Sequence, residues 1–228
     1  MKQNLTTSQN LALFDLDNTL LAGDSDYNWS LFLISEGLLD AKTHHDRNEQ
    51  FYQDYKKGCL DIVAFLEFQL QPLSQHKKSF LDALHLKYMQ TIIRPMMTVK
   101  AQSLVDQHKS AGDLCVVITA TNSFVTKPIA TAYGIEHLIG SDPEMHNGQY
   151  TGGVVGVPSF QEGKVTRLNL WLAERGKTLQ DFVTSYFYSD SHNDLPLMQL
   201  VTNPVAVDAD SILTAHAKQQ QWPQISLR

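Results

Sequence analysis

Short apolar runs alternate with stretches of helical periodicity along most of the chain. The apolar runs predict strands over residues 11–16, 114–119, 137–139, 186–189 and 205–207. The periodic stretches predict helices over residues 98–110, 123–132, 163–174, 195–201 and 211–220. Strands separated by single helices are typical of βαβ units, in which the strands lie parallel. We therefore expect an α/β fold in which helices flank a parallel sheet.

Residues 23–94 interrupt this alternation, because they show helical periodicity and no strand pattern. Four helices are expected there, over residues 26–36, 42–57, 62–70 and 75–93. The third is expected to end before Pro72 and the fourth before Pro95, because the residue before a proline disfavours helical geometry. We predict a core made of residues 1–22 and 95–228, and a helical cap domain of residues 23–94 inserted after the first strand.

One hairpin is predicted near the middle of the chain. The dipeptide Asn147-Gly148 stands between residues with strand-like spacing that extend to about residue 155. Asn-Gly suits the type I′ turn, whose two central residues both need positive φ.

Composition and charge exclude several classes of protein. The chain has 228 residues, of which 43% are hydrophobic and 18% charged, as in an ordinary globular protein. A net charge of -6 argues against a nucleic-acid partner, which would require a basic surface. Cys59 and Cys115 lack zinc spacing and favour a reducing compartment. Residues 1–10 lack the apolar stretch of a signal peptide, and no run is long enough to span a membrane. We expect a cytoplasmic protein without a membrane partner.

Polar side chains interrupt or follow the expected elements at several comparable places. They are Asp15 and Asp17 at the end of the first strand, Thr119 at the end of the second, Lys164 at a helix start, and Asp190, Asn193 and Asp194 after a later strand. Open α/β sheets bind ligands at the carboxyl ends of their strands. We therefore expect these side chains to form one site.

This set of side chains suits phosphoryl chemistry. Several carboxylates at one place repel one another and call for a cation, and oxygen ligands without thiolates favour Mg²⁺. A lysine and a threonine hydroxyl suit phosphoryl oxygens. One carboxylate can attack phosphorus to form an aspartyl-phosphate, and a second can transfer the protons.

The order of these residues resembles that of the haloacid dehalogenase-like (HAD) hydrolase superfamily. The resemblance rests on Asp-x-Asp-x-Thr from Asp15 to Thr19, then Thr119, Lys164, and the two acids Asp190 and Asp194. Residues 189–194, Ser-Asp-Ser-His-Asn-Asp, are similar to the Gly-Asp-Gly-x-Asn-Asp pattern of subfamily IB, which includes phosphoserine-phosphatase-like and histidinol-phosphatase-like enzymes. This resemblance implies a Rossmann-like sheet with a helical, C1-type cap.

The resemblance also implies a role for each residue. Asp15 is the implied nucleophile and Asp17 the implied general acid and base. The implied phosphate-binding groups are Thr119, the backbone N–H of Ala120, Lys164 and Asn193. The implied groups around Mg²⁺ are Asp15, the backbone carbonyl of Asp17, Asp190, and Asp194 acting through a water. Asp24, nine residues after the nucleophile, is implied to hold a substrate amine, whereas Asp26 is expected on a solvated face.

Two departures from the family pattern bear on the substrate. Ser189 and Ser191 replace the usual glycines. The only arginines of residues 23–94, Arg47 and Arg94, do not match the family's arginine that binds a substrate carboxylate. We predict a small amine-bearing phosphoester, phosphoserine-like or histidinol-phosphate-like, and the missing arginine counts against phosphoserine itself.

Two other functions fit parts of the pattern. A phosphotransferase or mutase would use the same aspartyl-phosphate but conserve the phosphoester. A phospho-receiver signalling module also combines acids, a hydroxyl and a lysine, but such domains are shorter and lack both the helical cap and an acid at the position of Asp17. The pattern leaves monomer and homodimer equally open.

Overall fold

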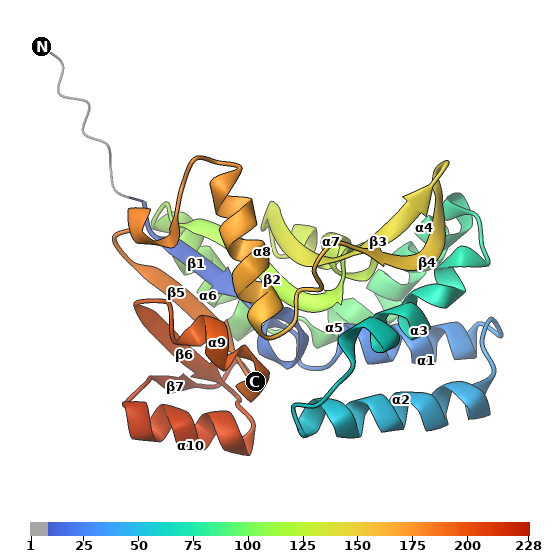
Figure 1. Cartoon of the computed structure of the whole chain (residues 1–228), viewed down its shortest axis with the longest axis horizontal. Coiled ribbons are helices and arrows are strands. Elements are labelled where there is room, and N and C mark those ends of the chain that lie inside the picture. Colours follow the sequence, from blue (N-terminus) through green and yellow to red (C-terminus); the bar gives the residue numbers. More distant parts are fainter. Residues whose placement is uncertain (1–8) are drawn as a thin grey trace, which may run out of the picture.

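The computed structural model describes residues 9–228 (Figure 1). The predicted lack of a signal peptide concerns residues 1–10, of which the first eight lie outside the described residues. No helix of the described chain is long and apolar enough to cross a bilayer.

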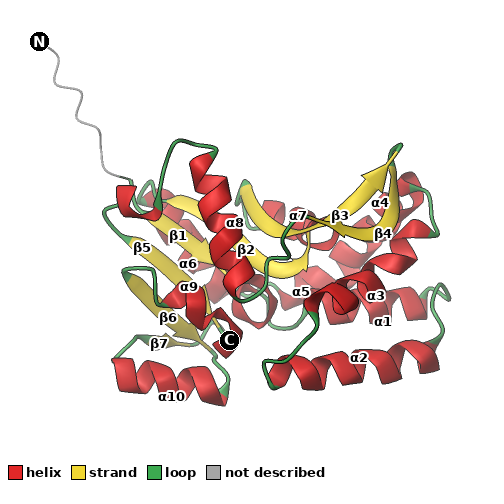
Figure 2. Cartoon of the chain, in the orientation of Figure 1, coloured by secondary structure: helices red, strands yellow, loops and turns green. Residues whose placement is uncertain are grey.

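A single sheet runs through the molecule in the order β4-β3-β2-β1-β5-β6-β7. Its strands are β1 (Leu11–Phe14), β2 (Leu114–Asn122), β3 (His137–His146), β4 (Gln149–Val155), β5 (Ser185–Ser189), β6 (Asn203–Val207) and β7 (Gln224–Ile225). All neighbouring strands are parallel except β3 and β4, which are antiparallel. The predicted α/β fold with a parallel sheet is confirmed (Figure 2).

Helices cover both faces of the sheet because the central strand alternates its side chains between two apolar cores. Ala12 and Phe14 pack into one core with residues of α6 (Val99–Ser110) and α7 (Ser123–Ala132). Leu11 and Leu13 pack into the other core. The helices on that side are α8 (Glu162–Ala173), α9 (Leu195–Met198) and α10 (Ser211–Gln220). This period-two alternation is expected of a strand buried on both faces.

Between β1 and β2 the chain forms only helices and turns, and we refer to residues 23–94 as the helical region. Its helices are α1 (Ser25–Ser35), α2 (Ala41–Lys56), α3 (Ile62–Ser74), α4 (Lys78–Tyr88) and the first residue of α5 (Arg94–Met96). The carboxylates of Asp24, Asp40 and Asp61 cap the first three helices by accepting backbone N–H groups. That this region forms a separate cap domain stays a prediction.

Two predicted helix ends in this region are wrong. α3 does not end before Pro72 but continues to Ser74, since a proline near the last turn removes only one backbone donor. The single helix expected over residues 75–93 begins only at Lys78 and changes at Met89 into a wider turn, where the N–H of Arg94 donates to the carbonyl of Met89. The wider turn lets the chain stay helical through Pro95 to Met96, beyond the predicted end.

The predicted hairpin is present and extends the sheet toward the helical region. Asn147 and Gly148 have φ values of 50° and 77°, as a type I′ turn requires. β3 continues well past residue 139, the predicted end of its strand, and β4 packs against α3. In Figure 1 the β3–β4 ribbon lies beside the helices of this region, so the sheet and the helical region share a long contact.

Candidate active site

The carboxyl ends of β1, β2 and β5 bring the predicted residues together. Asp15 follows β1, and its N–H donates to the carbonyl of Tyr188 in β5 at 2.9 Å. The chain then turns sharply within residues 16–20, where Asn18 has a φ of 56° and the N–H of Leu21 donates to the carbonyl of Leu16. This turn brings Thr19 back to Asp15 instead of continuing the strand.

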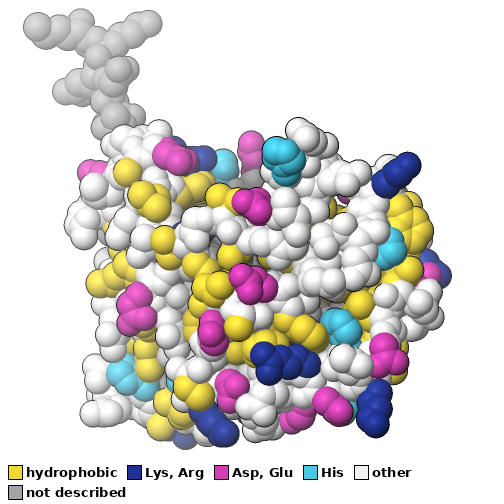
Figure 3. Space-filling model, turned by 45° about the vertical axis from the view of Figure 1, so that its right-hand side comes forward, with side chains coloured by type: hydrophobic (Ala, Val, Ile, Leu, Met, Phe, Trp, Pro, Cys, Tyr) yellow, Lys and Arg dark blue, Asp and Glu magenta, His cyan; other side chains and the backbone are white. Residues whose placement is uncertain are grey.

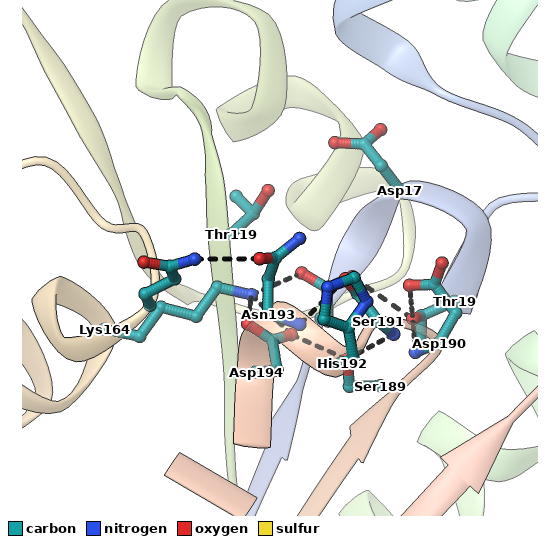
Figure 4. A network of polar contacts seen from close by, with 12 residues as sticks. Asp17, Thr19, Thr119, Lys164, Ser189, Asp190, Ser191, His192, Asn193 and Asp194 are labelled. Atoms are coloured by element: carbon teal, nitrogen blue, oxygen red, sulfur yellow. Dashed lines mark hydrogen bonds and ion pairs between the residues drawn. The ribbon is translucent and has the colours of Figure 1, made fainter. Parts of the chain in front are cut away.

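Lys164 joins two of the predicted acids. Its Nζ lies 2.8 Å from Asp15 Oδ1 and 2.8 Å from Asp194 Oδ2, and all three side chains are buried (Figure 4). Burial disfavours the charged lysine, but the two carboxylates outweigh this effect and raise its pKa. The preceding Gly163 has no room for a side chain, because a Cβ would collide with the carbonyl oxygen of Pro158. The tight turn at Gly163 therefore directs Lys164 into the site.

Thr19 links Asp15 to Asp190. Its hydroxyl oxygen lies 3.1 Å from Asp15 Oδ2 and 2.9 Å from Asp190 Oδ1, and it accepts the N–H of Asp190 at 3.0 Å. Burial raises the pKa of both carboxyls, and the charge of Asp15 raises the pKa of Asp190 further. We refer to Asp15, Thr19, Lys164, Asp190 and Asp194 as the carboxylate cluster.

Asp17 stands apart from this cluster (Figure 4). Its Oδ1 accepts the N–H of Ser25 at 2.5 Å, and its Oδ2 accepts the hydroxyl of Thr121 at 2.8 Å. Burial, helped by the charge of Asp24, raises the pKa of Asp17 to about 6. The carboxyl can therefore gain and lose a proton near neutral pH.

The serines that replace two family glycines both make side-chain hydrogen bonds. Ser189 Oγ donates to Asp194 Oδ2 at 2.6 Å. Ser191 Oγ accepts the hydroxyl of Tyr55 at 2.8 Å and the N–H of Asn193 at 3.2 Å. The amide of Asn193, expected to contact phosphate, is engaged at both ends by other protein groups, although the residue also lines the cavity described next.

A cavity of about 410 Å³ lies over these residues. Its floor includes most of the predicted site residues, which are Asp15, Asp17, Thr119, Ala120, Lys164, Asn193 and Asp194. The predicted residues thus line one cavity, apart from Asp190. Thr19 links Asp190 to Asp15, which does line the cavity. Their individual roles stay predictions.

The helical region supplies most of the other side of the cavity. We refer to the residues Asp24, Asp26, Tyr27, Glu49, Phe51 and Tyr55 as the cavity wall. Asp24 both caps α1, by accepting the N–H groups of Asp26 and Tyr27 at 2.9 Å, and lines the cavity. The three wall acids form no ion pair with any other described residue.

The expectation that Asp26 is solvated is wrong. Its side chain is buried, and Asn122 Nδ2 donates to its Oδ1 at 3.3 Å. Burial raises the pKa of Asp26 well above its ordinary value, and Asp24 and Asp17 add to this rise. The aromatic residues of the cavity wall were not singled out from the sequence, although the spacing of Phe51 and Tyr55 already puts them on one face of α2.

Figure 3 shows charged side chains of both signs interspersed on the outer face of the molecule. The cavity differs, because its lining contains six Asp or Glu side chains and only one lysine or arginine, Lys164. This local excess of negative charge favours a cationic ligand.

No three His, Cys, Asp or Glu side chains of residues 9–228 are arranged as a complete metal site. Mg²⁺ does not need such a site, because it keeps several waters and binds through one or two carboxylates and a substrate phosphate. Asp15 and Asp190 approach each other around Thr19, and no lysine or arginine of the described chain forms an ion pair with Asp190. This pair of carboxylates, of which Asp15 is buried and Asp190 is half-buried, fits a divalent cation.

The family comparison agrees with the motifs. A model of the haloacid dehalogenase-like hydrolases matches residues 12–199. The chain belongs to this family, and the predicted resemblance is confirmed. Enzymes of the family are generally Mg²⁺-dependent.

Two relatives with similar sequences are phosphatases. A histidinol-phosphatase from Neisseria meningitidis serogroup C is 48% identical over 221 residues, covering 96% of this chain and 100% of its own length. A phosphoserine phosphatase from Mycobacterium tuberculosis is 27% identical, covering 92% of this chain and 68% of its own. The chain is an enzyme, a phosphatase of this family, as predicted.

Solved structures agree on the fold. A Bordetella pertussis protein of unknown function aligns with a TM-score of 0.92 and 48% identity, covering 97% of this chain and all of its own. A substrate-bound phosphoserine phosphatase aligns with a TM-score of 0.66 at 17% identity, covering 96% and 93% of the two chains. The second likeness concerns the fold alone.

Proposed function

We propose that this chain is a Mg²⁺-dependent phosphomonoesterase that forms an aspartyl-phosphate and acts on a small amine-bearing ester of the histidinol-phosphate type. The observation that carries this proposal is the ion pair of Lys164 with Asp15 at the floor of an otherwise acidic cavity. The 48% identity to a histidinol-phosphatase over nearly the whole chain supports the substrate class.

In the first half-reaction, an oxygen of Asp15 attacks phosphorus, and the bond from phosphorus to the leaving oxygen breaks. Lys164 neutralises charge on the phosphoryl oxygens, and Thr119 and the N–H of Ala120 donate to them. Protonated Asp17 gives its proton to the leaving alkoxide, for which a pKa of about 6 is suitable. The products are an alcohol and phosphorylated Asp15.

In the second half-reaction, ionised Asp17 takes a proton from a water that attacks phosphorus. The bond from phosphorus to Asp15 breaks, inorganic phosphate forms, and Asp17 is protonated again. Thr121 and the N–H of Ser25 hold the Asp17 carboxyl in one orientation for both transfers.

The residues that would hold Mg²⁺ are Asp15, Asp190 and the backbone carbonyl of Asp17, with Asp194 acting behind them. When bound, the ion supplies positive charge that stabilises the phosphoryl group and offsets the repulsion between the buried carboxylates. Ser189 and Lys164 meanwhile hold Asp194 in place through bonds of 2.6 and 2.8 Å.

The cavity wall supports an amine-bearing substrate. Asp24, Asp26 and Glu49 face the cavity without a cationic partner, and the lining contains no arginine for a substrate carboxylate. An ester with a cationic leaving group satisfies these acids, whereas phosphoserine would place a carboxylate among them.

The test is release of inorganic phosphate from a panel of esters, with Mg²⁺ and with a chelator. The panel contains histidinol phosphate, phosphoserine, an alkyl phosphate without an amine and p-nitrophenyl phosphate. We expect Mg²⁺-dependent release with the highest kcat/KM for histidinol phosphate. Equal kcat/KM for the esters with and without an amine would contradict the substrate class, and transfer of phosphate to an alcohol without release would contradict hydrolysis.

A further inference from the structure

The last turn of α2 touches the loop that follows β5. Tyr55 Oη donates to Ser191 Oγ at 2.8 Å, and Asn193 Nδ2 donates to the carbonyl of Tyr55 at 3.2 Å. The side chain and the backbone of Tyr55 are therefore both bound to a loop that carries Asp190 and Asp194. These contacts join the helical region to the floor of the cavity.

Gln161 adds a second bridge between the same parts. Its Nε2 donates to Asn193 Oδ1 at 2.8 Å and to the carbonyl of Gly58 at 3.3 Å. Gln161 has a φ of 49° and a ψ of -123°, a conformation that favours glycine. Such strain persists only where surrounding contacts hold it, and it is typical of functional sites.

The Ser191 hydroxyl takes part in two hydrogen bonds at once. Its hydroxyl accepts Tyr55 Oη while it also caps the short turn that contains Asn193 and Asp194. A glycine at this position, as in the resembling branch, would lack the hydroxyl. Burial raises the pKa of Tyr55 well above its ordinary value, and the nearby Asp190 and Asp194 add to the rise, so the phenol stays protonated and can donate.

We propose that Tyr55 and Ser191 form a latch that holds the helical region against residues 190–194 while substrate is bound. This inference rests on the proposed phosphatase function of the cavity. Tyr55 also lines the cavity, so a break in its contacts opens that side to water. The apparent affinity for substrate falls with the fraction of molecules that are closed, and Tyr55 is thus a positioning residue.

The test is a double-mutant cycle on KM and kcat with histidinol phosphate. We expect Tyr55→Phe and Ser191→Ala each to raise KM about 3- to 10-fold, the effect of one lost hydrogen bond, with kcat changed less than about twofold. The double variant should show the KM of Ser191→Ala alone, because Tyr55→Phe removes only a bond that Ser191→Ala has already removed. Tyr150→Phe is the control, since no hydrogen bond of its hydroxyl to another described residue is found.

The latch would be overturned if the KM increase in the double variant were the product of the two single increases. A fall in kcat at constant KM would also overturn it. Ser191→Gly replaces Ser191→Ala if that variant does not fold. Hydrogen exchange at the amides of residues 191–194 without substrate tests the latch independently of catalysis. Faster exchange in Tyr55→Phe, which leaves the Ser191 cap in place, supports the latch, and unchanged exchange in this variant overturns it. If the wild-type chain hydrolyses no ester, the proposed function fails while the exchange experiment still decides the latch.

Discussion

The carboxylate cluster and the cavity wall are both acidic, but they differ in whether their acids have a cationic partner. In the cluster, Lys164 lies 2.8 Å from both Asp15 and Asp194, and Thr19 joins Asp15 to Asp190. In the wall, Asp24, Asp26 and Glu49 have no cationic partner among residues 9–228. We therefore expect the cluster to carry out the reaction and the wall to hold the ligand, because the acids of the cluster already have partners and those of the wall have no cationic partner. Substitutions should therefore affect chemistry and stability in the cluster, and substrate selection in the wall.

The largest effect is expected from Asp15→Asn in the cluster. An amide cannot attack phosphorus, so kcat should fall by at least about 1,000-fold. Phosphate release under Mg²⁺ measures this loss, and the exposed Asp106→Asn is the matched control. Wild-type turnover by Asp15→Asn would show that another group is the nucleophile.

Lys164→Met should cause the largest loss of stability. The substitution leaves Asp15 and Asp194 buried without their cation, at a cost of about 3–5 kcal/mol. Without Lys164 the pKa of each acid rises further in the folded protein. An acid with a raised pKa in the folded state makes the folded protein less stable as the pH increases. Thermal unfolding should therefore show a larger loss at pH 8 than at pH 5. Lys87→Met removes an exposed ion pair with Glu36 and should cost less than about 1 kcal/mol.

Asp17→Asn should lower the activity and, at high pH, raise the stability. Proton transfer is lost, so kcat should fall about 100- to 10,000-fold. The pKa of Asp17 rises from 3.8 to about 6 in the folded state, so its ionised form destabilises the fold above that pH by up to roughly 3 kcal/mol. With chelator present, the variant should therefore unfold at a higher temperature than wild type at pH 8, with little difference at pH 4. Equal shifts at the two pH values would contradict this origin.

The smallest effect is expected from Asp24→Asn in the cavity wall. Asparagine also caps helices well, so α1 keeps its cap and only the charge is removed. KM for histidinol phosphate should rise about tenfold, while KM for p-nitrophenyl phosphate stays unchanged. Asp40→Asn, at the cap of α2, is the control because Asp40 lies outside the cavity lining. An equal rise in KM for both esters would mean that Asp24 supports the fold and not the substrate.

The chemistry-bearing positions could be predicted because they depend on local patterns. Asp15 and Asp190 each follow a short apolar run, and the parallel sheet brings the ends of such runs to one edge. The turn at Asn147-Gly148 and the cap at Asp24 are likewise encoded within a few residues. The predicted fold class needed nothing more than this alternation of patterns.

The errors in the helical region have a different origin. The ends of the helices near Pro72 and Pro95 depend on how many backbone donors the surroundings leave unsatisfied, which a local rule does not count. Asp26 has the polar identity of a surface residue, yet it is buried because α1 packs over Asn122 at the end of β2. Its burial depends on a contact between residues 96 positions apart.

The sequence by itself therefore determined the sheet, the helical region and the set of groups that could handle a phosphoryl group, because strand periodicity and turn chemistry act over short distances. Only the tertiary structure decided which groups meet. Lys164 lies 149 residues from Asp15, and Tyr55 lies 136 residues from Ser191. Lys164 and Asp15 were expected in one site from the motif order, whereas the contact between Tyr55 and Ser191 had no local signal. Such a contact arises only when packing overcomes the entropy of closing the intervening chain.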